Sequence, residues 1–297
     1  MTLLRCATLV VGDVEAATAR YVKWLDYRIV ERGTVPGELA EAWQAPASSG
    51  RRYSVLQPAS GSQVLLRFVE GDDVPDYQPI RSYGWAATEI CVQDVEAVNE
   101  RMERSEFEVI GPPKPLDGFP TVKPMQVRGP DREIVYLTEI RTDDPASGLP
   151  TPRTLIDRPF ILVLACSDLA ASMAWVRDVL GFDMIDPVSI HYSMISLSFG
   201  LPEGEKVALT TVKYEGETFL ELDQYPAGTV VRPQHEGALP PGVALCTINH
   251  PDFATLEGHW LVPPVARQGA LYAGARSGIL RMPDGVLLEV IEGGRTE

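Results

Sequence analysis

Apolar and polar positions along the chain follow a pattern that occurs four times. The first copy starts with an apolar run at residues 6–11, passes Asp13, continues with apolar residues at helical spacing and ends in further apolar runs. Short apolar runs rich in Val predict strands. An aspartate directly before a helical segment predicts an N-cap, because its carboxylate accepts free amide hydrogens of the first turn. Each copy is therefore expected to contain a strand, a helix and further strands.

The later copies repeat this order at regular intervals. Their capping positions are Asp94, Asp168 and Asp252, so that successive caps lie 74 to 84 residues apart. The second and fourth copies also share a Pro-Asp turn that leads into a strand, at residues 127–139 and 280–292. Repetition at a fixed spacing indicates duplicated structural units. We therefore expect an α+β fold with curved, mostly antiparallel sheets and helices on their outer faces.

A proline-rich segment of mixed polarity at residues 141–155 is typical of a linker between domains. It predicts an N-terminal domain and a C-terminal domain, each with two repeats. The N-terminal domain spans 1–140 with repeats 1–70 and 85–140, and the C-terminal domain spans 156–297 with repeats 156–226 and 240–297.

Composition narrows the class of protein and its partners. The chain has 297 residues, of which 45% are hydrophobic and 23% charged, so it can bury a full core. Its net charge of −15 repels nucleic acid and anionic membranes, and neither is expected as a partner. The chain has no apolar run of about 18 residues and no secretory signal pattern. Four scattered cysteines favour a reducing cytoplasm.

The repeats resemble the vicinal oxygen chelate (VOC) superfamily, which includes glyoxalase I, bleomycin-resistance proteins, fosfomycin-resistance enzymes and extradiol dioxygenases. The likeness rests on DLAASMAWVRDVLGF at 168–182, DVEAVNERM at 94–102 and MPDGVLLE at 282–289. It implies βαβββ modules that pair edge to edge, with each pair forming a cup. We expect the first repeat to pair with the second, and the third with the fourth.

The resemblance also implies a divalent metal held by a His or Gln on a first strand and a Glu on a last strand. In this chain the first-strand positions are Cys6, Ala87, Ile161 and Leu245, and the last-strand positions are Arg67, Tyr136, Glu221 and Glu289. The histidines are missing. A metal such as Fe, Zn or Mn therefore stays open only as an alternative, with Glu289 and Glu221 as its ligands.

In the expected N-terminal cup, Arg67 and Tyr136 are candidate substrate-binding residues, because an Arg and a Tyr together can hold a carboxylate or phenolate oxygen. The structural alternative, which we favour, is that Arg67 forms a salt bridge with a neighbour. Cys6 is a further candidate lining residue. We interpret it as a buried strand residue at a lost ligand position rather than a nucleophile, because no histidine lies nearby in the sequence.

In the expected C-terminal cup, Glu221 and Glu289 are predicted to face the same cavity. Two close carboxylates cannot both ionise easily in a poorly hydrated site, so the pKa of one should rise and permit acid/base catalysis. His191 is a candidate acid/base partner or third ligand, and Trp260 is a candidate wall of an aromatic pocket.

These features favour a small-molecule protein with degenerate metal sites and carboxylate acid/base chemistry, on an aromatic molecule as one option. An enzyme such as a lyase or isomerase is favoured over a binding protein. The alternatives are a metal-dependent dioxygenase or glyoxalase-type enzyme with atypical ligands, and a protein that only sequesters its ligand, as some resistance proteins do. A fold of this kind hosts many functions, so it does not choose among them. A homodimer also stays open.

Overall fold

Four similar units make up the computed structural model, which describes residues 2–142, 147–202 and 204–293. The first contains β1 (Leu4–Val11), α1 (Val14–Leu25), β2 (Tyr27–Thr34), α2 (Gly37–Ala42), η1 (Pro46–Ser48), β3 (Arg52–Pro58) and β4 (Leu65–Glu70). The second contains β5 (Gly84–Val92), α3 (Val95–Met102), β6 (Glu108–Gly111), β7 (Val122–Arg128) and β8 (Ile134–Ile140).

The two later units are longer and less regular. The third contains β9 (Ile156–Cys166), α4 (Leu169–Trp175), the π-helical segment η3 (Val176–Leu180), β10 (Asp183–Met184), β11 (Val188–Ile190), α5 (Ser193–Phe199), β12 (Val207–Tyr214) and β13 (Glu217–Gln224). The fourth contains β14 (Gly242–His250), η4 (Phe253–Leu256), β15 (Val262–Ala266), β16 (Arg276–Arg281), η5 (Pro283–Gly285) and β17 (Leu287–Glu292).

Aspartate caps begin the helices of the first three units as predicted. Asp13 accepts hydrogen bonds from two amides of α1, and Asp94 does the same for α3, while Asp168 accepts one from α4. In the fourth unit a short 3-10 turn replaces the helix, and Asp252 makes no side-chain capping bond to it. Gly258, whose φ is +90°, follows soon after and favours an early end to the turn.

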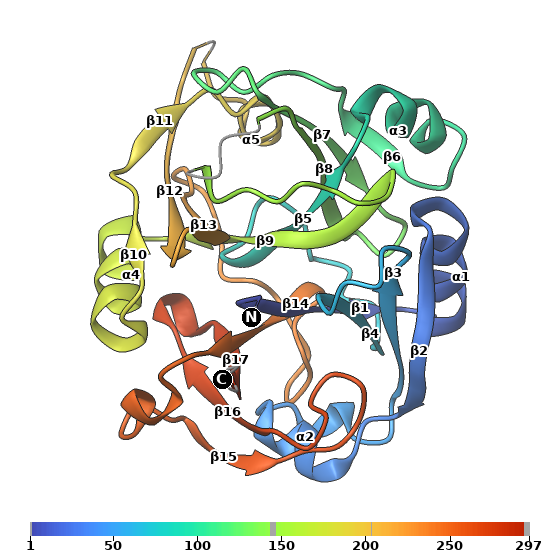
Figure 1. Ribbon diagram of the computed structural model, residues 1–297, viewed down its shortest axis with the longest axis vertical. Coiled ribbons are helices and arrows are strands. Elements are labelled where there is room, and N and C mark those ends of the chain that lie inside the picture. Colours follow the sequence, from blue (N-terminus) through green and yellow to red (C-terminus); the bar gives the residue numbers. More distant parts are fainter. Residues whose placement is uncertain (1, 143–146, 203, 294–297) are drawn as a thin grey trace.

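The pairing of the units differs from the expected one. The eight-stranded sheet has the order β15-β16-β17-β14-β1-β4-β3-β2 and so joins the first unit to the fourth. The nine-stranded sheet has the order β10-β12-β13-β9-β5-β8-β7-β6 and joins the second unit to the third. Figure 1 shows the two curled sheets one above the other. We call the concave side of the first sheet the terminal cup and that of the second the central cup.

The expected pairing of consecutive repeats is therefore wrong. In each sheet the first strands of two units lie antiparallel at the centre, β1 beside β14 and β5 beside β9. The segment 141–155, predicted to separate two domains, connects strands of the same sheet, although its residues 143–146 lie outside the described residues. The boundaries 1–140 and 156–297, each of which encloses two consecutive repeats, remain a prediction.

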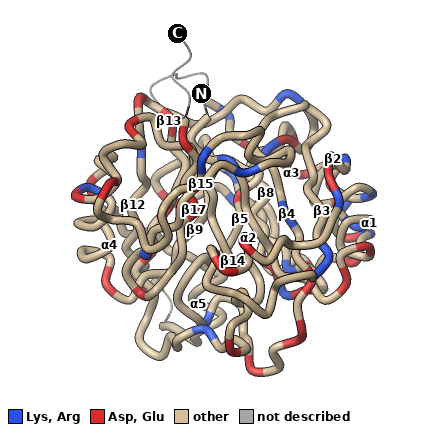
Figure 2. Tube along the Cα trace, turned by 90° about the horizontal axis from the view of Figure 1, so that it is seen from below, with Lys and Arg blue, Asp and Glu red and all other residues tan. Residues whose placement is uncertain are grey.

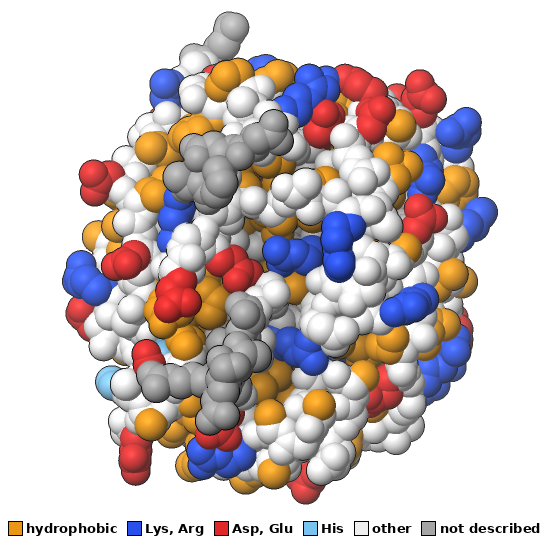
Figure 3. Space-filling view, in the orientation of Figure 1, with side chains coloured by type: hydrophobic (Ala, Val, Ile, Leu, Met, Phe, Trp, Pro, Cys, Tyr) orange, Lys and Arg blue, Asp and Glu red, His pale blue; other side chains and the backbone are white. Residues whose placement is uncertain are grey.

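Three apolar cores hold the fold together. The largest contains residues of both sheets and of α1, α3 and α4, including Tyr21, Phe68 and Phe182. A second lines the terminal cup beneath α2, and a third lines the central cup beneath α5. Charged residues lie mostly at the periphery of the tube in Figure 2, and acidic and basic side chains are interspersed on the face in Figure 3. Among the described residues, no helix is long and apolar enough to span a membrane.

Candidate functional site

A buried ion pair occupies the terminal cup. The Arg67 guanidinium, from β4 of the first unit, donates from Nη2 to Glu289 Oε2 of β17 at 3.2 Å. Both side chains are buried, with exposed fractions of 3% and 1%. Arg67 thus forms a salt bridge, as the structural alternative predicted, and its partner comes from the opposite end of the chain.

Every polar group around this pair is engaged. Glu289 accepts hydrogen bonds from Thr247 Oγ1 at 2.8 Å, from the Tyr272 hydroxyl at 2.9 Å and from Trp43 Nε1 at 3.4 Å. Arg67 also donates to Thr8 Oγ1 at 3.0 Å and to the Tyr272 hydroxyl at 2.8 Å. Burial raises the pKa of Tyr272, which keeps its hydroxyl a donor. Because both carboxylate oxygens are occupied, Glu289 is poorly placed to accept a substrate proton.

The residues of the terminal cup do not fit a divalent metal. Arg67 already supplies positive charge beside Glu289, and a guanidinium has no lone pair for a metal. Cys6 is fully buried in the same cup, and burial is the main cause that raises the pKa of its thiol to about 11. A thiol of that pKa is a poor metal ligand and a poor nucleophile near neutral pH.

Three buried carboxyl groups face the central cup. Glu89 on β5 is paired in register with Ile161 on β9, and Val163, two residues along β9, is paired with Glu221 on β13. Since side chains alternate along a strand, Glu89, Glu221 and Asp223 all point to the same face. Their exposed fractions are 7%, 9% and 0%.

These carboxyl groups have few donors and no cation. Thr138 Oγ1 donates to Glu89 at 2.5 Å, and the Tyr192 hydroxyl donates to Glu221 at 3.4 Å. Within the described ranges, no Lys, Arg or His forms an ion pair with any of the three, and no N–H or O–H group donates to Asp223. The carboxyl groups of Asp223 and Glu221 influence each other, and burial together with their interaction raises the pKa of Glu221.

Burial is the main cause of raised pKa values in this cluster. It raises the pKa of Glu89 to about 7, against the hydrogen bond from Thr138. It raises the pKa of Asp223 to about 7, and the pKa of Glu221 rises well above its ordinary value because Asp223 and Glu89 add to the effect of burial. Near neutral pH the cluster therefore holds a protonated acid beside groups that can accept a proton.

Three tyrosines complete the polar lining of the central cup. The rings of Tyr136 and Tyr192 lie 6.1 Å apart between centroids. The buried hydroxyls of Tyr136 and Tyr225 have no hydrogen-bond partner in the part of the chain that the structure describes. Burial and the neighbouring acids raise the pKa values of both, so both hydroxyls stay protonated. They are available as donors to a ligand.

A pocket of about 270 Å³ lies beside the cluster, against Gln126, His191, Tyr192 and the segment 110–117. Tyr192 lines the pocket and also donates to Glu221, so it separates the pocket from the acids. His191 lines the pocket without a hydrogen bond to a cup carboxyl. Among the described residues, no three or more His, Cys, Asp or Glu side chains are grouped to hold a metal ion.

The predicted site residues are thus divided between two cups. Glu221 and Tyr136 lie in the central cup and Glu289, Arg67 and Cys6 in the terminal cup, so the expected cavity shared by Glu221 and Glu289 does not exist. Trp260 packs against Phe253, with ring centroids 5.0 Å apart, in the core between the sheets and outside both cups.

Sequence reasoning missed Glu89 and Asp223 in the central cup. The alternation in the segment ELD, residues 221–223, already places Asp223 on the same face as Glu221. Glu89 carried a similar signal, as a lone charge within the apolar strand 84–92.

Comparison with known proteins supports the assignment of the fold. It does not indicate which reaction the site carries out. No family model and no curated protein matches the chain. Glyoxalase I from Zea mays matches with a TM-score of 0.65 and 16% identity, covering 97% of this chain and 92% of that chain. A putative dioxygenase from Bacillus subtilis subsp. subtilis str. 168 matches with a TM-score of 0.63 and 14% identity, covering 97% of this chain and 84% of that chain. The expected VOC fold with tandem repeats is confirmed.

Proposed function

We propose that the chain acts on a small molecule in the central cup, where Glu89, Glu221 and Asp223 move protons. One observation carries this proposal: three buried carboxyl groups share a cup that contains no compensating cation among its described residues. Buried acids usually have charged partners, because an unpaired buried charge is strongly unfavourable. Groups with strongly shifted pKa values in a cleft are frequent at active sites.

The unequal acidities suggest separate roles. Glu221, whose pKa rises well above its ordinary value, is assigned as the general acid, and Glu89 or Asp223, with pKa values of about 7, as the base. The base removes a proton from a carbon beside a substrate carbonyl, and the acid gives one to another atom. A proton then passes from the base back to the acid, which restores the starting protonation state. The Tyr136 and Tyr225 hydroxyls would donate to the oxygen that gains negative charge. This chemistry suits an isomerase or lyase.

A binding role is the second candidate, and the cover of the cup favours it. Helix α5 and Tyr192 close over the acids, so a bound molecule would be largely removed from water. Such a site serves sequestration as well as catalysis. We also propose a small-molecule partner, a homodimer and a cytoplasmic location. The four free, buried cysteines support a reducing compartment.

Hydrogen exchange in D₂O tests the assigned chemistry. A panel of small aromatic and aliphatic carbonyl compounds is first screened by thermal shift, and each hit is followed by proton NMR for loss of the C–H signal beside the carbonyl. The wild-type protein should exchange at least one hit. Glu221→Gln and Asp223→Asn should slow that exchange by about a hundredfold or more, the usual scale of general acid/base catalysis.

Glu133→Gln is the matched control. Glu133 is also buried, and burial raises its pKa to about 7, but its contacts are Tyr21 and Arg20 outside the cups. Exchange should be unchanged in this variant. Stabilisation by a hit without exchange would favour sequestration, and equal exchange in all variants would contradict the proposal.

A further inference from the structure

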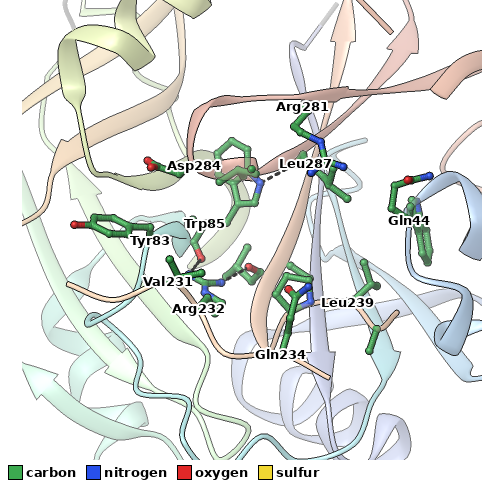
Figure 4. A pocket seen from close by; sticks show the side chains of 18 residues that line it. Gln44, Tyr83, Trp85, Val231, Arg232, Gln234, Leu239, Arg281, Asp284 and Leu287 are labelled. Carbon is green, nitrogen blue, oxygen red and sulfur yellow. Dashed lines mark hydrogen bonds between the residues drawn. The ribbon is translucent and has the colours of Figure 1, made fainter. Parts of the chain in front are cut away.

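A second cavity, of about 450 Å³, lies apart from the carboxyl cluster. It is bounded by Trp43 after α2, by Trp85 at the start of β5, by the turn between β16 and β17, and by the segment 231–240 (Figure 4). We call it the arginine pocket, because Arg232 and Arg281 both line it. Its volume is within the range that small-molecule sites occupy, about 300–1,000 Å³.

The walls of the arginine pocket are apolar and aromatic. Trp43 and Trp85 are almost fully buried, and Leu239 and Ala244 continue the same wall. Both indole N–H groups are already used, that of Trp85 by the Leu287 carbonyl at 2.9 Å and that of Trp43 by Glu289. The two rings, each 1% exposed, therefore form the buried base of the pocket, and a ligand meets the half-buried side chains of Tyr83, Val286 and Leu287. Such a wall suits the flat, apolar body of an aromatic ligand.

The side chains that line this pocket carry more positive than negative charge. Arg232 donates to the carbonyls of Trp85 and Val243, both at 2.8 Å, and to Ser82 Oγ at 3.1 Å, all of which are neutral acceptors. Its charge is therefore not neutralised by these contacts. Arg281 is exposed, and no ion pair or hydrogen bond of its guanidinium occurs with another described residue.

The acidic side chain of the pocket is held elsewhere. The Asp284 carboxylate accepts a hydrogen bond from the Ser167 backbone amide at 2.9 Å and another from the Ser167 hydroxyl. Two arginines thus oppose one carboxylate that is already engaged, in a chain whose net charge is −15. A local excess of positive charge on an acidic protein favours an anionic ligand.

We propose that the arginine pocket binds a small aromatic carboxylate, with its ring against Leu287, the cross-strand neighbour of Arg281, and its carboxylate on Arg281. The inference is independent of the acid/base chemistry assigned to the central cup. It also gives the terminal cup a role. The Arg67 guanidinium lies 4.5 Å from the Trp43 ring centroid, and Glu289 accepts the indole N–H, so the buried ion pair fixes part of the base of the pocket. Arg67 and Glu289 are positioning residues for this site.

Calorimetric titration with 2-naphthoate tests the proposal, with the neutral 2-naphthamide as the matched ligand. Wild-type protein should bind the carboxylate more tightly than the amide. Arg281→Gln should weaken 2-naphthoate about tenfold, the scale of one charge-assisted hydrogen bond at an exposed site, and should leave 2-naphthamide unchanged. Both effects should shrink as salt is added.

Arg276→Gln is the control, because Arg276 lies on the same strand, is exposed and is already paired with Glu292 at 2.7 Å. It should bind 2-naphthoate as the wild type does. Glu221→Gln should also leave this affinity unchanged, which separates failure of this inference from failure of the central-cup proposal. No binding of 2-naphthoate by the wild type, or equal affinities in R281Q and R276Q, would overturn the inference.

Discussion

Arg67 Nη2 lies 3.2 Å from Glu289 Oε2, although the two residues are 222 positions apart in the chain. The contact joins the first unit to the fourth across the middle of the terminal cup. It places a fixed positive charge beside the carboxylate that the VOC resemblance assigns to metal binding. Glu289 is therefore not available to bind a metal in the terminal cup. The carboxyl groups of the central cup have no such cationic partner.

Removing one member of the buried pair should destabilise the fold strongly. Arg67→Met keeps an apolar side chain against Trp43 but leaves Glu289 without its cation, so the free energy of unfolding should fall by about 3–5 kcal/mol. Urea denaturation measures this change. The double variant Arg67→Met, Glu289→Gln should recover part of the loss. Arg276→Gln, which breaks an exposed pair, should cost much less stability. Equal losses in R67M and R276Q would contradict the assignment.

The contribution of the central-cup acids to stability should decrease as the pH rises from about 4 to about 7. The folded pKa of Asp223 is about 7, above its ordinary value of 3.8, so the folded state binds more protons than the unfolded state in this window. A proton must therefore be removed from a buried group, and stability is lost until the pH passes the folded pKa. Glu89 and Glu221 act in the same direction.

Asp223→Asn removes the Asp223 contribution. Its stability relative to wild type should rise over this pH window, by an amount on the order of a few kcal/mol, and then level off. Thermal denaturation at a series of pH values measures the difference. Glu292→Gln is the opposite control, because Arg276 lowers the pKa of Glu292, so this variant should be slightly less stable than wild type at neutral pH. A difference between D223N and wild type that does not change with pH would refute the raised pKa.

Two buried tyrosine hydroxyls should respond differently to removal. The Tyr225 hydroxyl has no partner among the described residues, whereas that of Tyr272 donates to Glu289 and accepts from Arg67. Tyr225→Phe should therefore leave stability unchanged or raise it by about 1 kcal/mol, and Tyr272→Phe should lower it by about 1–3 kcal/mol. Denaturant titration of the two variants side by side makes the comparison. A large loss in Y225F alone would mean that its hydroxyl is engaged.

The cysteines should be unreactive in the folded protein. All four are buried, and burial raises the pKa of Cys6 to about 11 and those of Cys91 and Cys166 to about 12. Since the thiolate is the reactive form, a disulfide-exchange reagent should label them only on the timescale of unfolding. Reaction of Cys6 within seconds under native conditions would contradict its interpretation as a buried, unreactive strand residue.

The repeats could be recognised from the sequence because their signals are local. The caps Asp13, Asp94 and Asp168 and the apolar spacing after each of them depend on neighbouring residues alone. The pairing of units is a long-range property. The central strands β1 and β5 are buried on both faces, so their sequences do not indicate which partner strand lies beside them.

The same limit explains the errors at the site. Counting from the caps and turns placed Glu221 and Glu289 on last strands, as the structure has them. Both were assigned to one C-terminal cup, which is wrong because β13 and β17 belong to different sheets, and that assignment depends on the pairing of units. Arg67 is likewise an ordinary strand residue until the fourth unit brings Glu289 beside it. The acids Glu89 and Asp223 lie outside the positions that the resemblance singles out, and only the alternation along their strands indicated them.

The most direct test of the central claim is a pH titration of the Asp and Glu side-chain carboxyl groups by carbon-13 NMR. We expect Glu221 to remain protonated at pH 7, with Asp223 and Glu89 titrating near 7, and the signal assigned to Glu221 to be absent in Glu221→Gln. If all three carboxyl groups instead ionised near pH 4, as they do in water, the proposed proton-transfer site would not exist.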